Sequence, residues 1–412
     1  MIKFDSNAAT DAAIKQGLLY PQSRTLSVTI GGTAIPAVNI VADSLNIKSD
    51  IMSGDKLVFG GCLPSQLTVR IFNLKYIVSG NIEGAAITAS LITVYLDGGT
   101  EHTVTQPLFT GFVYSSKTLQ KRACSEIIAY DEFYRMGQMK CKDAVSNIFT
   151  NSPSALHTQY DIAQRTLAIY DSIYHTDLET QLAADKGFQY ELSPLLNIGM
   201  AQALFDSYAS DDLTVLDILK AHCELNARFG YIDGSGTLKF TTFYTETSSA
   251  TDKKPVDEAI LYYQNLTFED FDSAQVMYLS FPFNGNSSVV YGATDNKRYW
   301  YISDNIITQW CSSSSAVTVL LTNFWRANTD KNFIFYGISQ YRPFEMTTFG
   351  EFWLECGDRA TATVQVYNPQ TGLYNAETVD SFILTREIKG IANLKVRIQS
   401  QGSESLAKEV AT

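Results

Sequence analysis

Alternating apolar and polar residues dominate the first third of the chain. Apolar side chains occupy every second position in five stretches: residues 25–30, 67–72, 87–96, 108–114 and 125–130. This two-residue period is typical of strands that bury one face. Gly-Gly at 31–32 and Asp-Gly-Gly at 97–99 supply turns, and residues 33–41 continue extended. Six or seven short strands with glycine-rich turns predict an antiparallel barrel or sandwich.

The strand pattern is lost between Met136 and about Lys220. Five residues there recur at helical spacing: Tyr160, Ala163, Leu167, Tyr170 and Tyr174. They share one face of a helix, so the sequence predicts a helical region after the first set of strands.

A second helix and a hairpin are predicted from short local signals. Thr214 and Asp217 have the spacing of a capping box. The apolar face of the helix that follows would hold Leu216, Leu219 and Cys223. Gly230 stands where this helix would end. Residues 229–244 then predict a hairpin through the Asp-Gly-Ser-Gly turn at 233–236.

Strand patterns return after Ala259. Short runs rich in β-branched and aromatic residues occur at 276–281, 288–291, 334–336, 352–354, 361–367, 381–385 and 394–398. Residues 315–326 carry apolar residues at helical spacing, and we predict a helix there although Val and Thr favour strands.

A chain of 412 residues exceeds the size that a single core usually reaches. The predicted fold is mainly β with an α+β insert. We predict a first β domain at 1–135, the mixed α/β insert at 136–255, a β-rich connecting segment at 256–310, a second β domain at 311–400 and a polar tail at 401–412.

Charge argues against nucleic-acid readers and polybasic membrane binders. The chain has 31 Lys and Arg against 43 Asp and Glu, a net charge of −12, and no long basic run. Charged residues make up only 18% of the chain, whereas Tyr and Phe number 23 each. A weakly charged, aromatic surface is typical of a protein that lies against partners.

Compartment signals are few. Residues 1–5 are not followed by the apolar region of a secretory signal, and the apolar stretch 85–96 is too short and too polar to span a bilayer, so we expect no membrane insertion. The six cysteines include no CxxC pair. We therefore expect buried free thiols in a protein made in a reducing cytoplasm.

No catalytic, cofactor-binding or metal-binding constellation stands out. The four histidines form no HExxH or HxH motif, and neither a GxSxG elbow nor a phosphate-binding loop occurs. His222 and Cys223 are adjacent in the predicted helix, so their side chains point to different faces. We therefore expect no catalytic residue, no cofactor and no metal.

Acidic and aromatic clusters have simpler interpretations. Residues 269–272 (Glu-Asp-Phe-Asp) lack the spacing of a calcium loop and indicate a solvated connection. Asp211 and Asp212 precede the second helix, where they favour the positive end of its dipole. The aromatic runs 299–301 and 333–336 suit sugar stacking or packing at a core or subunit interface, and packing is the favoured interpretation.

Five stretches, in order, resemble the tail-hub (baseplate-hub) proteins of bacteriophages and contractile injection machines, the late control protein D-like group. They are SLNI at 44–47 leading into DKLVFGGCLPSQL at 55–67, IIAYDEF at 127–133, the helix and hairpin at 213–240, YRPF at 341–344 with LECGD at 354–358, and SFILTREIKG at 381–390. Cys356 replaces the usual proline, and residues 136–213 match nothing in the pattern.

The resemblance implies a structural virion protein at the tail tip or baseplate. It implies that the β domains at 1–135 and 311–400 are two small antiparallel β-barrel domains of tail-hub type, joined by the mixed α/β region. Such hubs are homotrimers in which each subunit contributes two barrels to a ring of six. The ring would join a sixfold tail tube or distal tail protein to a threefold tail-tip or fibre protein. It would also meet the tape-measure protein and let DNA pass without specific binding.

Two other classes remain as alternatives: a tail-associated cell-wall-degrading enzyme and a carbohydrate-binding adhesion module. Enzymatic activity in long hub chains usually lies in an extra C-terminal domain, whereas only a polar tail follows the last strand predicted here. The charge of −12 also allows two interpretations, an acidic channel wall that repels DNA and a soluble outer surface.

Overall fold

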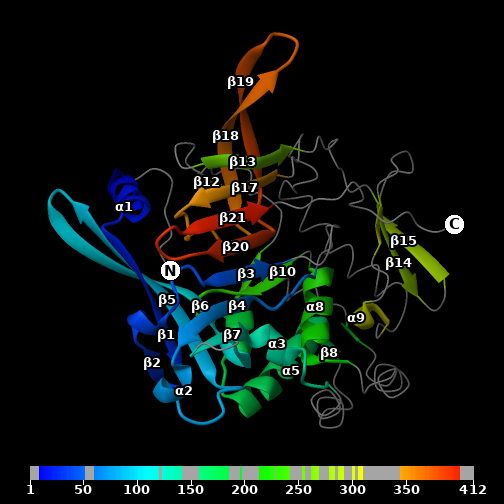
Figure 1. The fold of residues 1–412 in the computed structure, drawn as a ribbon. Coiled ribbons are helices and arrows are strands. Elements are labelled where there is room, and N and C mark those ends of the chain that lie inside the picture. The colour runs from blue at the N-terminus through cyan, green and yellow to red at the C-terminus, as the bar shows by residue number, and fades with distance from the viewer. Residues whose placement is uncertain are drawn as a thin grey trace.

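The computed structural model describes most of the chain (Figure 1). The described residues are 9–51, 60–119, 123–141, 157–184, 195–196, 213–226, 228–241, 253–255, 261–268, 278–283, 286–291, 299–301, 305–309 and 344–399.

The first third forms an antiparallel β unit. Its strands are β1 (Ser23–Ile30), β2 (Thr33–Ile35), β3 (Asn46–Asp50), β4 (Gln66–Phe72), β5 (Ala86–Asp97), β6 (Thr100–Thr118) and β7 (Cys124–Tyr130). All five alternating stretches are strands, as predicted, and their burial alternates as the pattern requires. Only the end of the 33–41 stretch differs: after Pro36 the backbone turns into a 3-10 helix, η1 (Ala37–Asn39).

Two glycines close the β5–β6 hairpin as the sequence predicted. Asp97 pairs with Thr100, which leaves Gly98 and Gly99 as a two-residue loop. Their φ angles are 56° and 84°, so both lie in the left-handed region that this kind of tight hairpin turn needs. Glycine reaches that region without the steric cost that other residues meet.

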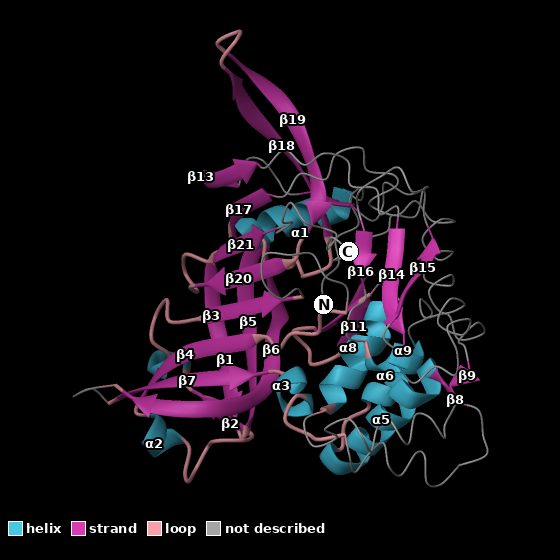
Figure 2. Ribbon diagram, turned by 90° about the vertical axis from the view of Figure 1, so that its right-hand side faces the viewer, coloured by secondary structure: helices cyan, strands magenta, loops and turns pink. Residues whose placement is uncertain are grey.

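Helices gather on one side of the molecule after the first β unit (Figure 2). They are α3 (Glu132–Met136), α5 (Gln159–Tyr174), α6 (Leu178–Ala184), α8 (Val215–Leu225) and the short α9 (Ile306–Gln309). The strands among them are β8 (His157–Thr158), β9 (Leu195–Leu196), β10 (Phe229–Ile232) and β11 (Leu238–Thr241). The helix predicted on the Tyr160–Tyr174 face, the helix predicted after Thr214 and the predicted hairpin are therefore confirmed.

The C-terminal part is again β. The remaining strands are β12 (Lys253–Pro255), β13 (Leu261–Phe268), β14 (Tyr278–Phe283), β15 (Asn286–Tyr291), β16 (Tyr299–Tyr301), β17 (Phe344–Phe349), β18 (Arg359–Asn368), β19 (Leu373–Phe382), β20 (Thr385–Lys389) and β21 (Lys395–Gln399). Strands β13, β17, β20 and β21 form the second β unit, whereas β12, β18 and β19 form a separate three-stranded sheet.

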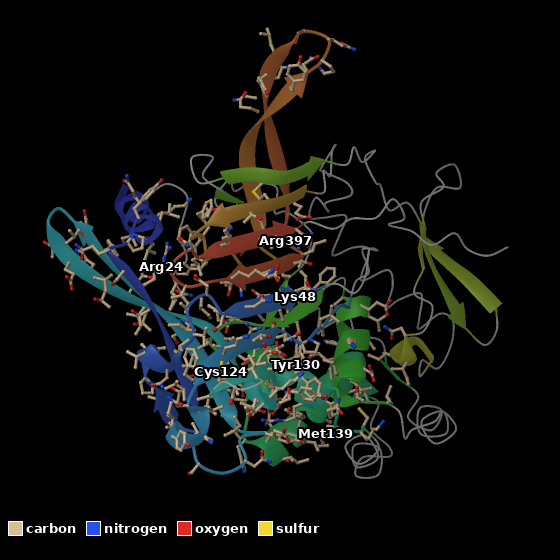
Figure 3. The ribbon with its side chains drawn as sticks, in the orientation of Figure 1. Arg24, Lys48, Cys124, Tyr130, Met139 and Arg397 are labelled. Atoms are coloured by element: carbon tan, nitrogen blue, oxygen red, sulfur yellow. The ribbon has the colours of Figure 1, made fainter. Side chains whose placement is uncertain are left out.

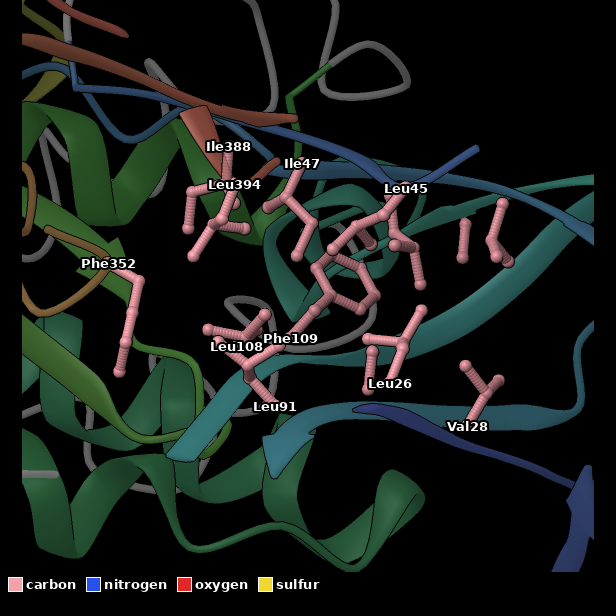
Figure 4. Close-up of a cluster of buried hydrophobic side chains, with 14 of the residues drawn as sticks. Leu26, Val28, Leu45, Ile47, Leu91, Leu108, Phe109, Phe352, Ile388 and Leu394 are labelled. Atoms are coloured by element: carbon pink, nitrogen blue, oxygen red, sulfur yellow. The ribbon is translucent and has the colours of Figure 1, made fainter. Parts of the chain in front are cut away.

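The predicted fold class, mainly β with a helical insert, is confirmed, with one addition. Strand β3 pairs with β20, so both β units belong to one sheet of order β13-β17-β21-β20-β3-β4-β7-β6-β5-β1-β2. A single hydrophobic cluster follows this sheet and includes Leu26 and Leu91 of the first unit and Ile388 and Leu394 of the second (Figure 4). The predicted boundaries at 135, 255, 310 and 400 stay predictions.

Two predicted strands are wrong. Residues 352–354 form turns with buried side chains, because Gly350 and Gly357, with φ of 81° and 87°, let the backbone bend on either side of them. The 381–385 run is interrupted at 383–384, where β19 ends and β20 begins. A short apolar run cannot by itself distinguish a strand from a buried turn. The predicted strand at 334–336 and helix at 315–326 lie outside the described residues.

Among the described α-helices, five were not predicted individually from the sequence: α1 (Ala9–Leu19), α2 (Leu74–Ile77), α3, α6 and α9. The first packs on β5, where a Cβ at Gly17 would lie 2.2 Å from the Tyr95 ring. Lys15 of α1 reaches Glu351 in the second β unit at 3.8 Å, so this helix contacts both units. Within the described residues, no helix is long and apolar enough to cross a membrane.

Candidate assembly site

The two β units meet along β3 and β20, which lie side by side in Figure 1. Ile47 of β3 lies opposite Ile388 of β20, and both are buried. Beyond the strand ends, the Ile51 amide donates to the Leu384 carbonyl at 3.0 Å. Because each paired strand satisfies the backbone groups of the other, neither unit leaves an open sheet edge at this seam.

A turn from the second unit closes over the seam. The Glu355 amide donates to Asp358 Oδ2 at 2.7 Å, which makes this acidic pair part of a turn. Arg386 of β20 is buried, and its Nη1 donates to the Leu354 carbonyl at 2.8 Å. Cys356 donates from its thiol to the Ser49 carbonyl of β3 at 3.2 Å. The turn is thereby tied to both strands of the seam.

Hairpin β10–β11 contacts both β units. Thr110 of β6 donates from Oγ1 to the Gly234 carbonyl at 3.0 Å. On its other strand, Thr241 donates from Oγ1 to the Gly357 carbonyl at 3.2 Å. Asp233 holds the turn, since its Oδ1 accepts the Thr237 amide at 3.0 Å. We call the seam, the 354–358 turn and this hairpin together the junction.

Gly60 and Gly61 let the chain pass close to the junction. The Gly60 amide donates to the Arg228 carbonyl at 2.9 Å, and its φ of 83° lies in the left-handed region. Gly61 accepts from the Gly230 amide at 3.1 Å. A Cβ at Gly61 would lie 1.9 Å from the Ile51 carbonyl oxygen, so any side chain there would collide with the backbone. The glycine pair at 60–61 is therefore required by close approach.

Asp131 connects the first β unit to the helices. It is the N-cap of α3: Oδ1 accepts the Phe133 amide at 3.1 Å, and Oδ2 accepts the Ser65 amide at 2.8 Å. Complete burial raises the pKa of Asp131 to about 7, against the lowering effect of these two hydrogen bonds. The carboxyl joins two of the five stretches that resemble tail-hub sequences, which we call the hub-like stretches.

Glu132 continues this connection into the helical layer. Its carboxylate accepts a hydrogen bond from the Tyr170 hydroxyl of α5 and lies 3.3 Å from the Arg135 guanidinium. That guanidinium in turn stacks over the rings of Phe112, at 3.2 Å, and Tyr174, at 4.7 Å. We call Glu132, Arg135 and Tyr170 the latch, because they join the first β unit to α5.

The capping box of α8 is present as predicted. The Asp217 amide donates to Thr214 Oγ1 at 3.3 Å, and the Thr214 amide donates to Asp217 Oδ2 at 2.9 Å. The face predicted to be apolar is buried: Leu216, Leu219 and Cys223. This helix presents Cys223 to Cys62 of the first unit, with their sulfurs 3.9 Å apart.

The described residues that were weighed as candidates for catalysis or metal binding lie apart from one another. His102 stacks on Tyr95 with ring centroids 5.4 Å apart, and His175 is exposed after α5. His222 is buried in α8, which lowers its pKa to about 3. In the described part of the chain, no three His, Cys, Asp or Glu side chains are grouped to hold a metal. Residues 211–212, 269–272 and 333–336 lie outside the described residues.

The cysteine prediction is confirmed for the described positions. Cys62, Cys124, Cys141, Cys223 and Cys356 are buried thiols that take part in no disulfide. Cys311 lies outside the described residues. Figure 3 shows Cys124 and Tyr130 of the first β unit in the lower part of the view and Arg397 of the second unit above them.

The segments that form the junction belong to the stretches singled out in the sequence, whereas the contacts between them were not predicted. The hydrogen bonds of Cys356 and Arg386 and the Glu132–Tyr170 pair were not predicted. One local signal was available, because an acidic pair directly after a strand and before Phe133 has the pattern of a helix N-cap. The partners of the other side chains lie far away in the sequence and leave no local signal.

No protein-family model matches the chain, and no curated protein matches it. Among solved structures, the tail protein from Neisseria meningitidis MC58 is similar at 11% identity and a TM-score of 0.47, over 93% of this chain and 98% of that one. The 43 kDa tail protein of prophage MuSo2 from Shewanella oneidensis is similar at 14% identity and a TM-score of 0.46, over 92% and 98%. The Francisella PdpA-VgrG complex contains a chain similar at 11% identity and a TM-score of 0.42, over 95% of this chain and 54% of that one. Phage tail proteins are thus among the solved structures that this chain resembles.

Proposed function

We propose that this chain is a structural tail-hub (baseplate) protein of a phage or phage-like particle. One observation carries the proposal: the hub-like stretches, far apart in the sequence, meet at the junction. Residues 46–50 pair with 385–389, and Cys356 of the fourth stretch binds Ser49, which lies between the two parts of the first stretch. Because these contacts unite both β units, the stretches act together as the framework that holds the units in one orientation.

In this role three copies form a ring at the tail tip or baseplate of the virion. The ring joins the sixfold tail tube, or a distal tail protein, to a threefold tip or fibre protein and meets the tape-measure protein. DNA passes through the channel without specific binding. A closed ring of identical chains requires contacts between unlike faces of neighbouring copies.

Deletion of the gene from a particle-producing strain tests the proposal. We expect filled heads and tail components that do not join into infectious particles, with function restored by the wild-type gene. A complemented strain that carries tagged protein should show label at the tail tip in electron micrographs. Normal, infectious particles in the absence of the protein would overturn the proposal.

The assembled ring is needed to test whether the wall of its channel is acidic. An acidic wall would repel DNA and let it slide, because basic walls would hold it through many phosphate contacts. We expect Asp and Glu to outnumber Lys and Arg on the surface that faces the ring axis in an imaged particle. A neutral or basic lining would mean that the charge of −12 serves only the outer surface.

A cell-wall-degrading enzyme is the alternative of a different class. We expect no loss of turbidity when purified protein is added to host cell walls, with a known lysozyme as the positive control. Turbidity loss that disappears on substitution of a single carboxylate or cysteine would replace the structural role with an enzymatic one.

A further inference from the structure

Strands β18 and β19 form a hairpin that projects far from the rest of the molecule (Figures 1 and 2). They pair from Arg359↔Phe382 to Asn368↔Leu373, and Gly372 in the turn has a φ of 67°. Only the first three residues of β18 pair with β12, and among the described strands β19 pairs with β18 alone. We call residues 365–376, the outer part of this hairpin from the Gln365↔Ala376 pair outward, the arm.

The composition of the arm is unusual for a projecting hairpin. Residues 365–376 contain no Asp, Glu, Lys, Arg or His, in a chain whose charged fraction is 18%, whereas Arg359, Glu377 and Asp380 stand nearer the base of the hairpin. Tyr367, Leu373 and Tyr374 near its end are 53%, 66% and 68% exposed. The two tyrosine rings lie together with centroids 5.4 Å apart. Exposed apolar side chains on an uncharged ribbon indicate a surface that meets another protein.

Hairpin β5–β6 provides the comparison within the same chain. It also projects from the body, and its end carries Asp97, Glu101 and His102. Leu96 is 50% exposed there, so this end combines an exposed apolar residue with charges. Charged side chains protect exposed strand edges from pairing with other chains. The arm lacks this protection, and a two-stranded ribbon alone is marginally stable in water.

We propose that the arm packs against the arms of other copies of this chain around a rotation axis. The proposal deepens the proposed function, because it rests on the trimeric ring. Residues near a rotation axis face their own copies, so a charge there would meet the same charge and repel it. An uncharged arm avoids this repulsion in a chain whose net charge is −12.

The polar residues of the arm suit contact with identical partners. Asn368, Gln370, Thr371 and Asn375 each carry both a donor and an acceptor, as do the tyrosine hydroxyls. Such a group can bind its own copy, whereas an ammonium group only donates and a carboxylate only accepts. Leu373 and the tyrosine rings supply the apolar area.

Paired charge variants test the proposal in the full-length protein. Leu373→Glu/Tyr374→Glu and Leu373→Lys/Tyr374→Lys introduce opposite charges at exposed positions, so folding should be preserved, as near-UV circular dichroism will check. We expect both variants to weaken self-association at least about 30-fold, the loss typical of interface hot spots. Leu96→Glu and Leu96→Lys in the β5–β6 hairpin are the matched controls and should leave association unchanged.

Light scattering separates the outcomes. Trimeric wild type with dissociated arm variants supports the proposal. If wild type and arm variants are equally trimeric, the result contradicts packing of arm against arm and is consistent with the proposed hub function. A wild-type protein that is monomeric at all concentrations overturns both the arm contact and the trimeric ring, whereas incorporation into tails still tests the hub role separately.

Cross-linking identifies what the arm touches. A photoreactive phenylalanine analogue replaces Tyr374, and ¹⁴N- and ¹⁵N-labelled copies are mixed so that links between copies carry both isotopes. We expect mixed-isotope links to residues 365–376. Links confined to one copy, or links from the arm to another region or to another tail protein, would contradict packing of arm against arm.

Discussion

The thiol of Cys356 donates a hydrogen bond to the Ser49 carbonyl, 3.2 Å away and 307 positions earlier in the chain. It ties a turn of the second β unit to strand β3 of the first. Burial raises the pKa of this thiol to about 12, so the group stays protonated and remains a donor near neutral pH. Proline, which the hub pattern has here, offers no such donor.

We predict that Cys356→Ala lowers the free energy of unfolding by about 1 kcal/mol through loss of this hydrogen bond. Cys356→Ser keeps a donor at the same place and should lose less. Urea unfolding followed by fluorescence measures both, with Cys124→Ala as a control that removes sulfur from another buried site. Equal losses in Cys356→Ala and Cys356→Ser would show that the hydrogen bond contributes nothing.

The latch should be sensitive to removal of one hydroxyl group. Tyr170→Phe leaves the buried Glu132 carboxylate without its hydroxyl donor, and we expect a loss of about 1–3 kcal/mol. Tyr76→Phe, at a position 77% exposed, is the control and should have no measurable effect. In the double variant with Glu132→Gln, the two losses should not add, because both remove the same interaction. Additive losses would contradict the latch.

Gly61 should not tolerate a methyl group. Gly61→Ala places a Cβ 1.9 Å from the Ile51 carbonyl oxygen, and we expect insoluble protein or a loss of more than about 3 kcal/mol. Gly137→Ala is the matched control, since its Cβ would find no atom closer than 3.4 Å. Soluble expression and thermal unfolding compare them. Equal behaviour of the two variants would mean that the backbone at 60–61 has room.

Two buried groups should give opposite pH dependence. Burial raises the pKa of Asp131 in the folded state to about 7. Between about pH 4 and 7 the folded protein therefore keeps a proton on this carboxyl that the unfolded protein loses, and the contribution of Asp131 to stability falls as pH rises. The pKa of His222 is lowered to about 3, so the folded state excludes a proton and its contribution rises with pH up to about 6.5. In wild type the two slopes oppose each other.

Removal of the Asp131 carboxyl should leave the rise of stability with pH that His222 contributes without the opposing slope. We expect the urea midpoint of Asp131→Asn to rise more steeply than wild type between pH 4 and 6.5, whatever its absolute stability. Asp97→Asn, at the exposed end of β5–β6, is the control and should leave the slope unchanged. A slope in Asp131→Asn equal to that of wild type would show that Asp131 does not titrate in this range.

Local patterns of the sequence determined much of the secondary structure. The alternation at 67–72 and 125–130 requires one buried face, and β4 and β7 bury that face as expected. Thr214 and Asp217 specify the start of α8 by contacts within one turn, so these two residues are enough to predict it. These signals are readable because the interacting groups are neighbours in the chain.

Only the tertiary structure decided how the two β units join and what surrounds the hub-like stretches. The apolar run 352–354 is buried in turns, because burial of an apolar side chain is favourable whether a strand, a helix or a turn carries it. Pairing of β3 with β20 and the bond from Cys356 to Ser49 join segments more than 300 positions apart. Such partners are chosen by packing and register in three dimensions, and no local period of the sequence encodes them.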